Sequence, residues 1–177
     1  MIIYIYAYLE FFDLCRTSNK HFCFINIIGQ EDSTGKEPVS RVCLGCICEA
    51  ASGCNITIGC DGSVCGPFRI TWAYWADAGK PIINDSMTQD AYPRCVNDVH
   101  CAARTVENYM WKYGQDCNSD GIINCDDYVR IHQLGAYGCT SSLNSKFENT
   151  YKHCILFIFM QENSQHNLSK EFHSVPF

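Results

Sequence analysis

The sequence has little positive charge, and its basic residues are scattered. Lys and Arg together number 13 against 19 Asp and Glu, which gives a formal net charge of -6 over 177 residues. Binding to nucleic acid or to an anionic membrane surface usually relies on clustered basic residues. We therefore expect neither nucleic acid nor a membrane among the partners of this chain.

Long apolar runs of the kind that cross a bilayer are also missing. The segment 1–12 is apolar but contains Glu10, and it has neither a basic start nor a clean small-residue cleavage site after it. It is too short for a transmembrane helix and departs from the pattern of a secretory signal peptide. We assign residues 1–40 to an N-terminal extension and linker, 41–155 to a single domain, and 156–177 to a C-terminal tail. Whether both ends belong to the mature protein is left open.

Cysteine, by contrast, is abundant, with 14 residues in the chain. Most lie between Cys43 and Cys139, a density typical of small domains that are stapled by disulfides in oxidising compartments. Zinc is the alternative, because Cys43-x-x-Cys46 resembles half of a zinc knuckle. However, Cys48 follows at once, and no second Cys-x-x-Cys or His pair lies downstream. Disulfides are therefore the favoured interpretation.

Three Asn-x-Ser/Thr sequons begin at Asn55, Asn84 and Asn167. Such triplets accept N-glycans in secreted proteins, but they also arise by chance, so their support is weak. Together with the cysteines they favour a secreted, extracellular protein, although a convincing signal peptide is not present in this sequence.

The spacing of apolar residues predicts three helices and a small sheet. Helical spacing occurs within 101–113 and 127–134, and residues 42–51 are predicted to form a helix that Gly53 ends. The runs 56–58 and 68–71 flank the turn Asp61-Gly62-Ser63 and predict a hairpin. The fold class is therefore α+β, mainly helical with a minor β-hairpin or sheet. An aromatic cluster after the second run serves either as core or as a sugar-stacking surface: Trp72, Tyr74 and Trp75.

The segment from Asp116 to Asp127 matches the template of a twelve-residue calcium loop. Glycine stands at position six, as Gly121, and position seven would contribute its backbone carbonyl. The candidate ligands are Asp116, Asn118, Asp120, Ile122, Asn124 and Asp127. The alternative is a turn rich in Asn, Asp and Gly that binds nothing. Calcium would be structural here, and we expect no cofactor in catalysis.

Several motifs together resemble the invertebrate-type (i-type) lysozyme, or destabilase, family. They are Cys43-Leu-Gly-Cys46-Ile-Cys48-Glu-Ala-Ala-Ser-Gly-Cys54, Cys65-Gly-Pro-Phe-Arg-Ile-Thr-Trp-Ala-Tyr-Trp75 and Gly135-Ala-Tyr-Gly-Cys139. The resemblance covers residues 41–155 and implies a small, disulfide-rich, lysozyme-like domain. Twelve cysteines in that range form an even set for six bridges: Cys43, Cys46, Cys48, Cys54, Cys60, Cys65, Cys95, Cys101, Cys117, Cys125, Cys139 and Cys154.

The resemblance also implies two catalytic carboxylates, a glutamic acid that donates a proton and an aspartate. The family acid immediately precedes Ser-Gly, and here that position is Ala51. Glu49 would replace it only if the backbone differed, since two residues of a helix are separated by about 200°. The second carboxylate corresponds to Asp61, which is equally well explained as a hairpin-turn residue.

Some members of the family are credited with isopeptidase activity, for which the resemblance points to Ser63 and His132. The lysine position of that activity is Thr71 here. Serines in turns and histidines on amphipathic helices are usually structural, which is the competing interpretation.

The sequence thus predicts an i-type lysozyme homologue that acts on peptidoglycan or chito-oligosaccharide, with activity reduced or lost. An isopeptidase using Ser63 and His132 is one alternative. A non-catalytic glycan-binding domain stiffened by calcium is the other.

Overall fold

The computed structural model describes residues 39–83 and 88–172, with side chains described as far as residue 160. Several features of the sequence lie outside these ranges. They are the apolar segment 1–12, Cys15, Cys23 and the sequon at Asn84. The side chain of Asn167 also lies outside the described part.

Helix α3, Arg41–Ser52, is largely buried. Its N-cap is Ser40, whose hydroxyl oxygen accepts a hydrogen bond from Cys43 N at 3.2 Å. Gly53 ends the helix in the left-handed conformation, with φ of 65°, which glycine adopts without steric cost. The predicted helix and its glycine stop are both confirmed.

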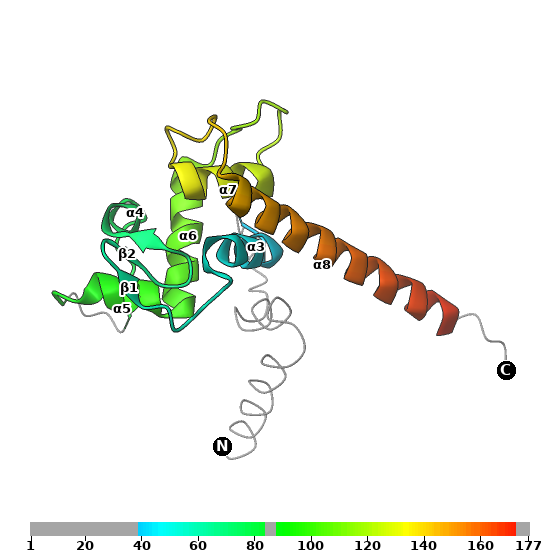
Figure 1. The fold of residues 1–177 in the computed structure, drawn as a ribbon, viewed down its shortest axis with the longest axis horizontal. Helices are drawn as coiled ribbons and strands as arrows, with labels where there is room; N and C mark the ends of the chain where they lie inside the picture. Colours follow the sequence, from blue (N-terminus) through cyan, green and yellow to red (C-terminus); the bar gives the residue numbers. More distant parts are fainter. Residues whose placement is uncertain (1–38, 84–87, 173–177) are drawn as a thin grey trace, which may run out of the picture.

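Helix α8, Ser145–Phe172, packs along α3 and then extends away from the rest of the domain (Figure 1). Phe147 and Tyr151 are buried in the core, and Ile155 and Ile158 pack against it. The boundary predicted after residue 155 lies inside this helix, because the sequence contains neither Pro nor Gly through Phe172. None of the helices in the described ranges is long and apolar enough to cross a membrane.

A small antiparallel sheet with the strand order β1-β2-β3 lies beside the helices (Figure 1). Its strands are β1 Cys60–Asp61, β2 Val64–Cys65 and β3 Ile70–Thr71. Asp61 pairs with Val64, and Val64 pairs with Thr71. The predicted turn is therefore correctly placed, since Gly62 and Ser63 connect β1 to β2.

The first strand of the predicted hairpin is wrong, because Ile56 and Thr57 form a turn and Ile58 belongs to no strand. Asn55 Oδ1 accepts a hydrogen bond from Thr57 N at 3.0 Å. A side chain that satisfies the backbone locally competes with strand pairing. Pairing begins only at Cys60, after Gly59 with φ of 65°.

Four further helices complete the domain: α4 Trp72–Asp77, α5 Ala91–Asn97, α6 Val99–Tyr113 and α7 Cys125–Leu134. The predictions of helices at 101–113 and 127–134 are confirmed, and each helix begins two residues earlier than predicted. The α+β class, mainly helical with a minor sheet, is likewise confirmed.

Between residues 43 and 154 the structure has six disulfides, as the cysteine count of that range predicted. The pairs are Cys43–Cys125, Cys46–Cys154, Cys48–Cys54, Cys60–Cys65, Cys95–Cys101 and Cys117–Cys139. Within the described residues no cysteine is free. Because Cys43, Cys46 and Cys48 are all bridged, the zinc-knuckle interpretation is wrong.

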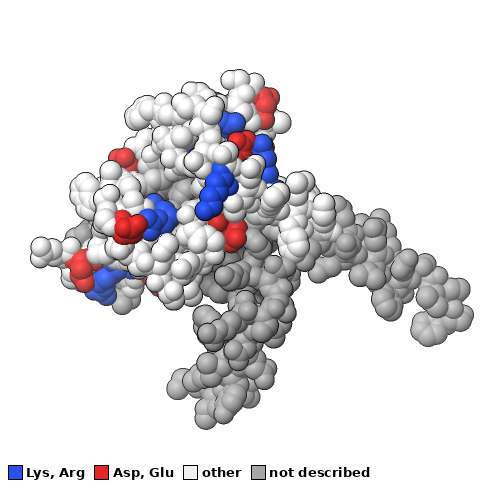
Figure 2. All heavy atoms as spheres, viewed as in Figure 1, with Lys and Arg blue, Asp and Glu red and all other residues white. Residues whose placement is uncertain are grey.

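Figure 2 shows the charged side chains on one face of the molecule. On the face shown in Figure 2, basic and acidic side chains lie beside one another rather than in patches of one sign. Arg69 and Asp61 form an ion pair, with Nη2 and Oδ2 3.3 Å apart.

Candidate functional site

The end of helix α3 is fixed against the segment between β2 and β3. Ser52 Oγ donates a hydrogen bond to Pro67 O at 2.6 Å. Ala51 precedes this anchor, is half-buried, and packs against the core. The position that the family resemblance assigns to the proton donor therefore lies close to the sheet and carries only a methyl group.

Glu49 lies on the same helix, two residues before Ala51. Helix α3 continues through Ser52, so the two side chains project about 200° apart around the helix axis. The backbone is regularly helical at both residues, so Glu49 does not reach the position of Ala51.

Asp61 is the last residue of β1, and its side chain is 83% exposed. Its carboxylate pairs with Arg69, and Gly62 follows it in the turn. The residue thus occupies a hairpin-turn position and also presents a carboxylate to solvent. Both interpretations of Asp61 are compatible with this geometry.

His132 on α7 is bound through both ring nitrogens. Nε2 lies 2.9 Å from Phe68 O, and Nδ1 lies 3.2 Å from the hydroxyl oxygen of Tyr74. Because a carbonyl only accepts, Nε2 carries the proton and Nδ1 accepts from Tyr74. Burial lowers the pKa of His132 from its ordinary 6.5 to about 4, against a smaller opposing effect of the Phe68 hydrogen bond. The imidazole is therefore neutral near pH 7.

Tyr74, which holds His132, is itself packed against other aromatic rings. Its ring stacks on that of Tyr109 with the centroids 3.8 Å apart and an interplanar angle of 14°. Burial raises the pKa of the Tyr74 phenol well above its usual range, so the phenol stays protonated and able to donate. Elements α4, α6 and α7 meet in this network.

Ser63 lies in the exposed turn between β1 and β2. Its carbonyl oxygen accepts a hydrogen bond from the Tyr92 hydroxyl at 3.1 Å. No hydrogen bond joins Ser63 to His132 within the described residues. Since both His132 nitrogens already have partners, the structure does not assemble the proposed nucleophile and base.

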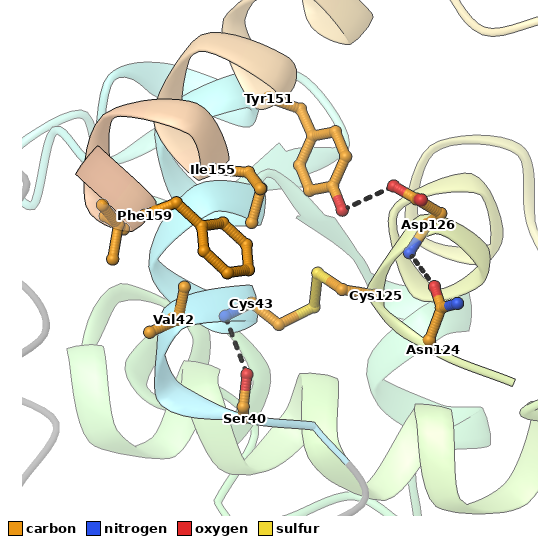
Figure 3. Close-up of a pocket in the computed structure, with 10 residues that line it drawn as sticks. Ser40, Val42, Cys43, Asn124, Cys125, Asp126, Tyr151, Ile155 and Phe159 are labelled. Carbon is orange, nitrogen blue, oxygen red and sulfur yellow. Dashed lines mark hydrogen bonds between the residues drawn. A yellow bond between two sulfur atoms is a disulfide. The ribbon is translucent and has the colours of Figure 1, made fainter. Parts of the chain in front are cut away.

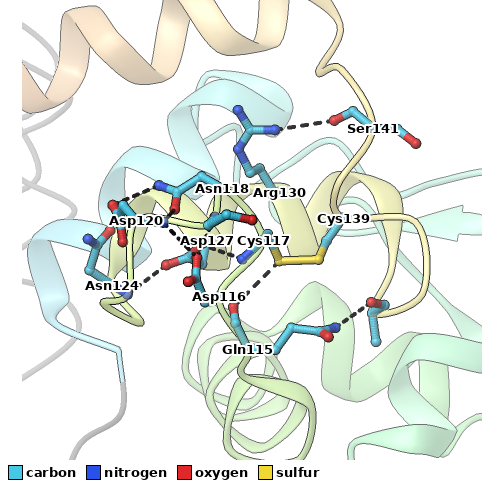
Figure 4. The surroundings of a disulfide bond; sticks show 12 residues. Gln115, Asp116, Cys117, Asn118, Asp120, Asn124, Asp127, Arg130, Cys139 and Ser141 are labelled. Carbon is cyan, nitrogen blue, oxygen red and sulfur yellow. Dashed lines mark hydrogen bonds between the residues drawn. A yellow bond between two sulfur atoms is a disulfide. The ribbon is translucent and has the colours of Figure 1, made fainter.

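The predicted calcium loop connects α6 to α7 and is shown with the adjacent Cys117–Cys139 bridge in Figure 4. Asp116 Oδ1 accepts from Ser119 N at 2.7 Å, and Oδ2 accepts from Gly121 N at 2.9 Å. Asp120 Oδ1 accepts from Ile122 N at 2.8 Å. These carboxylates hold the loop by binding its own backbone amides.

Asp127, at the last position of the loop, is fully buried. Its Oδ1 accepts from Cys117 N at 2.8 Å, and its Oδ2 accepts from Asn124 N at 2.9 Å. It thereby completes a capping box at the start of α7, where Asn124 is the N-cap. No group of three or more acidic, His or Cys side chains in the described ranges is arranged to hold a metal ion. Calcium binding stays a prediction that no observation tests.

The aromatic cluster divides between core and surface. Trp75 is buried, and its Nε1 donates to Pro81 O at 2.8 Å. Trp72 is 56% exposed, with Lys80 Nζ 5.7 Å from its ring centroid. Trp75 therefore serves the core, and Trp72 is the member that is free to meet a sugar ring.

A cavity of about 400 Å³ lies where the N-terminal ends of α3 and α7 meet α8 (Figure 3). Tyr151, Ile155 and Phe159 line it from α8, and the Tyr151 hydroxyl donates to Asp126 Oδ1 at 2.9 Å. The residues predicted for catalysis do not line this cavity.

Sequence reasoning missed the links that position His132 and Asp61. The tyrosine that binds His132 lies 58 residues away and the carbonyl 64 residues away, so no local pattern connects them. The partner of Asp61 was missed too, because Arg69 lies just before β3, whereas β1 pairs with β2 and places Val64 opposite Asp61.

The comparisons with known proteins agree with the resemblance seen in the sequence. The family model described as Destabilase matches residues 40–154. Invertebrate-type lysozyme 3 of Caenorhabditis elegans is 38% identical over 120 residues, which cover 65% of this chain and 86% of the relative. The lysozyme of Magallana gigas is 41% identical over 106 residues, which cover 57% and 69%.

Solved structures give the same result. A chain in the complex of Aeromonas hydrophila PliI with Meretrix lusoria lysozyme aligns with a TM-score of 0.55 at 32% identity, over 67% of this chain and 93% of that one. Tapes japonica lysozyme aligns with a TM-score of 0.52 at 33% identity, over 67% and 90%. The chain therefore belongs to the destabilase family of invertebrate-type lysozymes.

Proposed function

We propose that this chain is an extracellular lysozyme homologue that binds the glycan of bacterial cell walls and hydrolyses it poorly. The observation that supports the proposal is that Ala51, at the position that the family resemblance assigns to the acid, lies in the last turn of α3. The lysozyme names of its relatives support peptidoglycan as the ligand. Six disulfides support an oxidising, extracellular environment.

Glycoside hydrolysis needs a group that protonates the leaving oxygen as the bond to the sugar breaks. A methyl group has no proton to give, and loss of general acid catalysis typically lowers a rate by about 10²- to 10⁴-fold. Asp61 is the remaining carboxylate of the expected pair, and it lies exposed to solvent beside Arg69. In the family pattern this carboxylate stabilises or attacks the positive centre that develops on the sugar, so it does not replace the missing acid.

Binding does not depend on the missing acid. Trp72 presents an exposed ring close to β3, and an exposed indole offers a sugar ring an apolar face. The engagement of both His132 nitrogens gives the isopeptidase alternative no support. Recognition without efficient cleavage is therefore the function we infer.

The proposal is tested by measuring binding and turnover separately on the same insoluble peptidoglycan. Wild-type protein should bind the wall material saturably and release almost no soluble fragments. Ala51→Glu should raise the release of fragments, and Ala51→Gln is the matched control, because it has nearly the same size but no acidic proton.

Two outcomes would contradict this function. One is absence of saturable binding by the wild type. The other is equal fragment release from the Glu and Gln variants, which would show that added bulk rather than proton donation is responsible. Trp72→Ala should weaken binding to the wall material. When it is combined with Ala51→Glu and with Ala51→Gln, the ratio of fragment release by the first to that by the second should stay the same.

A further inference from the structure

The loop between α3 and β1 carries an Asn-x-Thr sequon that the hydrolytic function does not use. Asn55, Ile56 and Thr57 are all exposed. The loop is tied at both ends, since Cys54 is bridged to Cys48 and Cys60 to Cys65. It therefore presents the triplet to solvent from a short, fixed segment.

The amide of Asn55 is held by its oxygen. Oδ1 accepts hydrogen bonds from Thr57 N at 3.0 Å and from Thr57 Oγ1 at 2.9 Å. Asn55 N donates to Ser52 Oγ at 3.2 Å, which fixes the backbone of the residue as well. No hydrogen bond from Nδ2 is found within the described residues, so the nitrogen is the atom of this amide left for reaction.

We propose that Asn55 is an N-glycosylation site. The sequon supplies the recognition pattern, and the exposed loop can hold a bulky glycan without displacing any core side chain. This inference goes beyond the proposed wall-binding function and does not depend on it. The glycan would stand at the same end of α3 that carries Ala51.

The reaction is a transfer from a lipid diphosphate-linked oligosaccharide, the donor class of the secretory pathway. Nδ2 of Asn55 forms a bond to C1 of the first sugar while the bond between C1 and the diphosphate oxygen breaks. The lipid diphosphate leaves with the bonding electrons. The proton lost from Nδ2 passes to a base of the transferase, and no oxidant or reductant is needed.

The other two sequons provide comparisons within the same chain. Asn84 lies outside the described residues, and Asn167 lies in the helical part of α8. An extended or turn conformation, such as that of residues 55–57, suits an acceptor triplet better than a helix does. We therefore expect higher occupancy at Asn55 than at Asn167.

The test is expression of the full chain behind a cleavable secretory leader in insect cells, followed by peptide mapping of the secreted protein. Peptide N-glycosidase in heavy-oxygen water converts each glycosylated Asn into a labelled Asp. The peptide that contains Asn55 should carry the label, and the glycosidase should shift the intact protein to lower mass.

Asn55→Gln and Thr57→Ala should each remove the label from this peptide, while Thr57→Ser should keep it. The conservative serine variant controls for folding, because it retains the hydroxyl and the local hydrogen bonds. An unlabelled Asn55 in secreted wild-type protein would overturn the proposal. So would an equal label in Thr57→Ala, which would show that the sequon is not what is recognised.

Discussion

At the scale of single residues, His132 is held as a neutral imidazole by two partners far away in the sequence. Phe68 O accepts from Nε2, and the Tyr74 hydroxyl donates to Nδ1. Protonation of Nδ1 would place a positive charge in a buried site, and this burial is the main reason why the folded state favours the uncharged form.

The free energy of unfolding should therefore fall as the pH decreases from about 6.5 to about 4. In this window the unfolded imidazole, with its ordinary pKa of 6.5, takes up a proton that the folded one, with a pKa of about 4, does not. Each unit of pKa difference corresponds to about 1.4 kcal/mol, and the effect stops growing below the folded pKa.

Urea unfolding of the wild type and of His132→Gln at pH 7 and pH 4.5 measures this contribution. The carboxylates change the free energy of unfolding by the same amount in both proteins between pH 7 and pH 4.5. The difference between the two changes is therefore the contribution of His132. We expect the wild type to lose more stability than the variant. Equal losses would show that His132 is not neutral and buried as described.

Asp127 is the second residue on which the local structure depends. Its two oxygens accept from Cys117 N and Asn124 N, and the side chain is fully buried. Asp127→Ala leaves both donors without partners, at about 1–3 kcal/mol for each. Asp120→Ala, on the exposed part of the loop, should cost less than about 1 kcal/mol. Denaturant unfolding in the presence of chelator compares the two, and equal costs would contradict the role of Asp127.

At the scale of elements, the sequence predicted α3, α6 and α7 and missed the other helices of the described ranges, α4, α5 and α8. The helices 101–113 and 127–134 have a strong apolar period, and Gly53 marks the end of α3. The strands have two residues each, too few for an alternating pattern to be read. The first strand begins later than predicted, because the side chain of Asn55 accepts the hydrogen bond from the backbone N–H of Thr57 that a neighbouring strand would otherwise accept. The position of Ala51, in contrast, followed directly from the resemblance.

Gly66 shows why the Cys-Gly-Pro motif requires its glycine. Its φ is +73°, and a Cβ placed there would lie 1.7 Å from Val96 O at the end of α5. Gly66→Ala should lower the free energy of unfolding by roughly 3–5 kcal/mol or prevent folding, as overpacking and backbone strain combine. Gly62 has φ of +60° and no atom within 4 Å of such a Cβ.

Gly62→Ala is therefore the matched control, with an expected cost of about 1–2 kcal/mol from the backbone conformation alone. The melting temperatures of the two variants, measured by thermal unfolding, distinguish the effect of a steric clash with Val96 from the effect of backbone strain alone. Similar melting temperatures for the two variants would contradict the packing of Gly66 against α5.

The loop from Asp116 to Asp127 allows a direct test of the calcium prediction. A ligand that binds only the folded state raises the melting temperature once its concentration exceeds the dissociation constant. If the loop binds calcium, the wild type should melt at a higher temperature with calcium than with chelator, and Asp120→Ala should lose this difference. If the melting temperature of the wild type is the same with calcium and with chelator, the calcium prediction is wrong and the loop is a turn that its own hydrogen bonds stabilise.

At the scale of the whole molecule, the fold and the chemistry depend on different residues. The Cys46–Cys154 bridge joins residues separated by 108 positions and attaches α8 to α3. None of the six bridges involves Ala51, and its small side chain packs within the domain. The bridges that hold the fold therefore do not depend on the residue at position 51, so the family resemblance predicts the fold more directly than it predicts the activity.

The most direct test is the hydrolysis of bacterial cell walls by the pure wild-type protein, measured beside Glu49→Gln and Ala51→Glu. We predict a wild-type rate at least about 100-fold below that of an enzyme with its general acid in place, and no effect of Glu49→Gln. Vigorous hydrolysis by the wild type that Glu49→Gln abolishes would show that Glu49 supplies the proton and would contradict the assignment of the missing acid to Ala51.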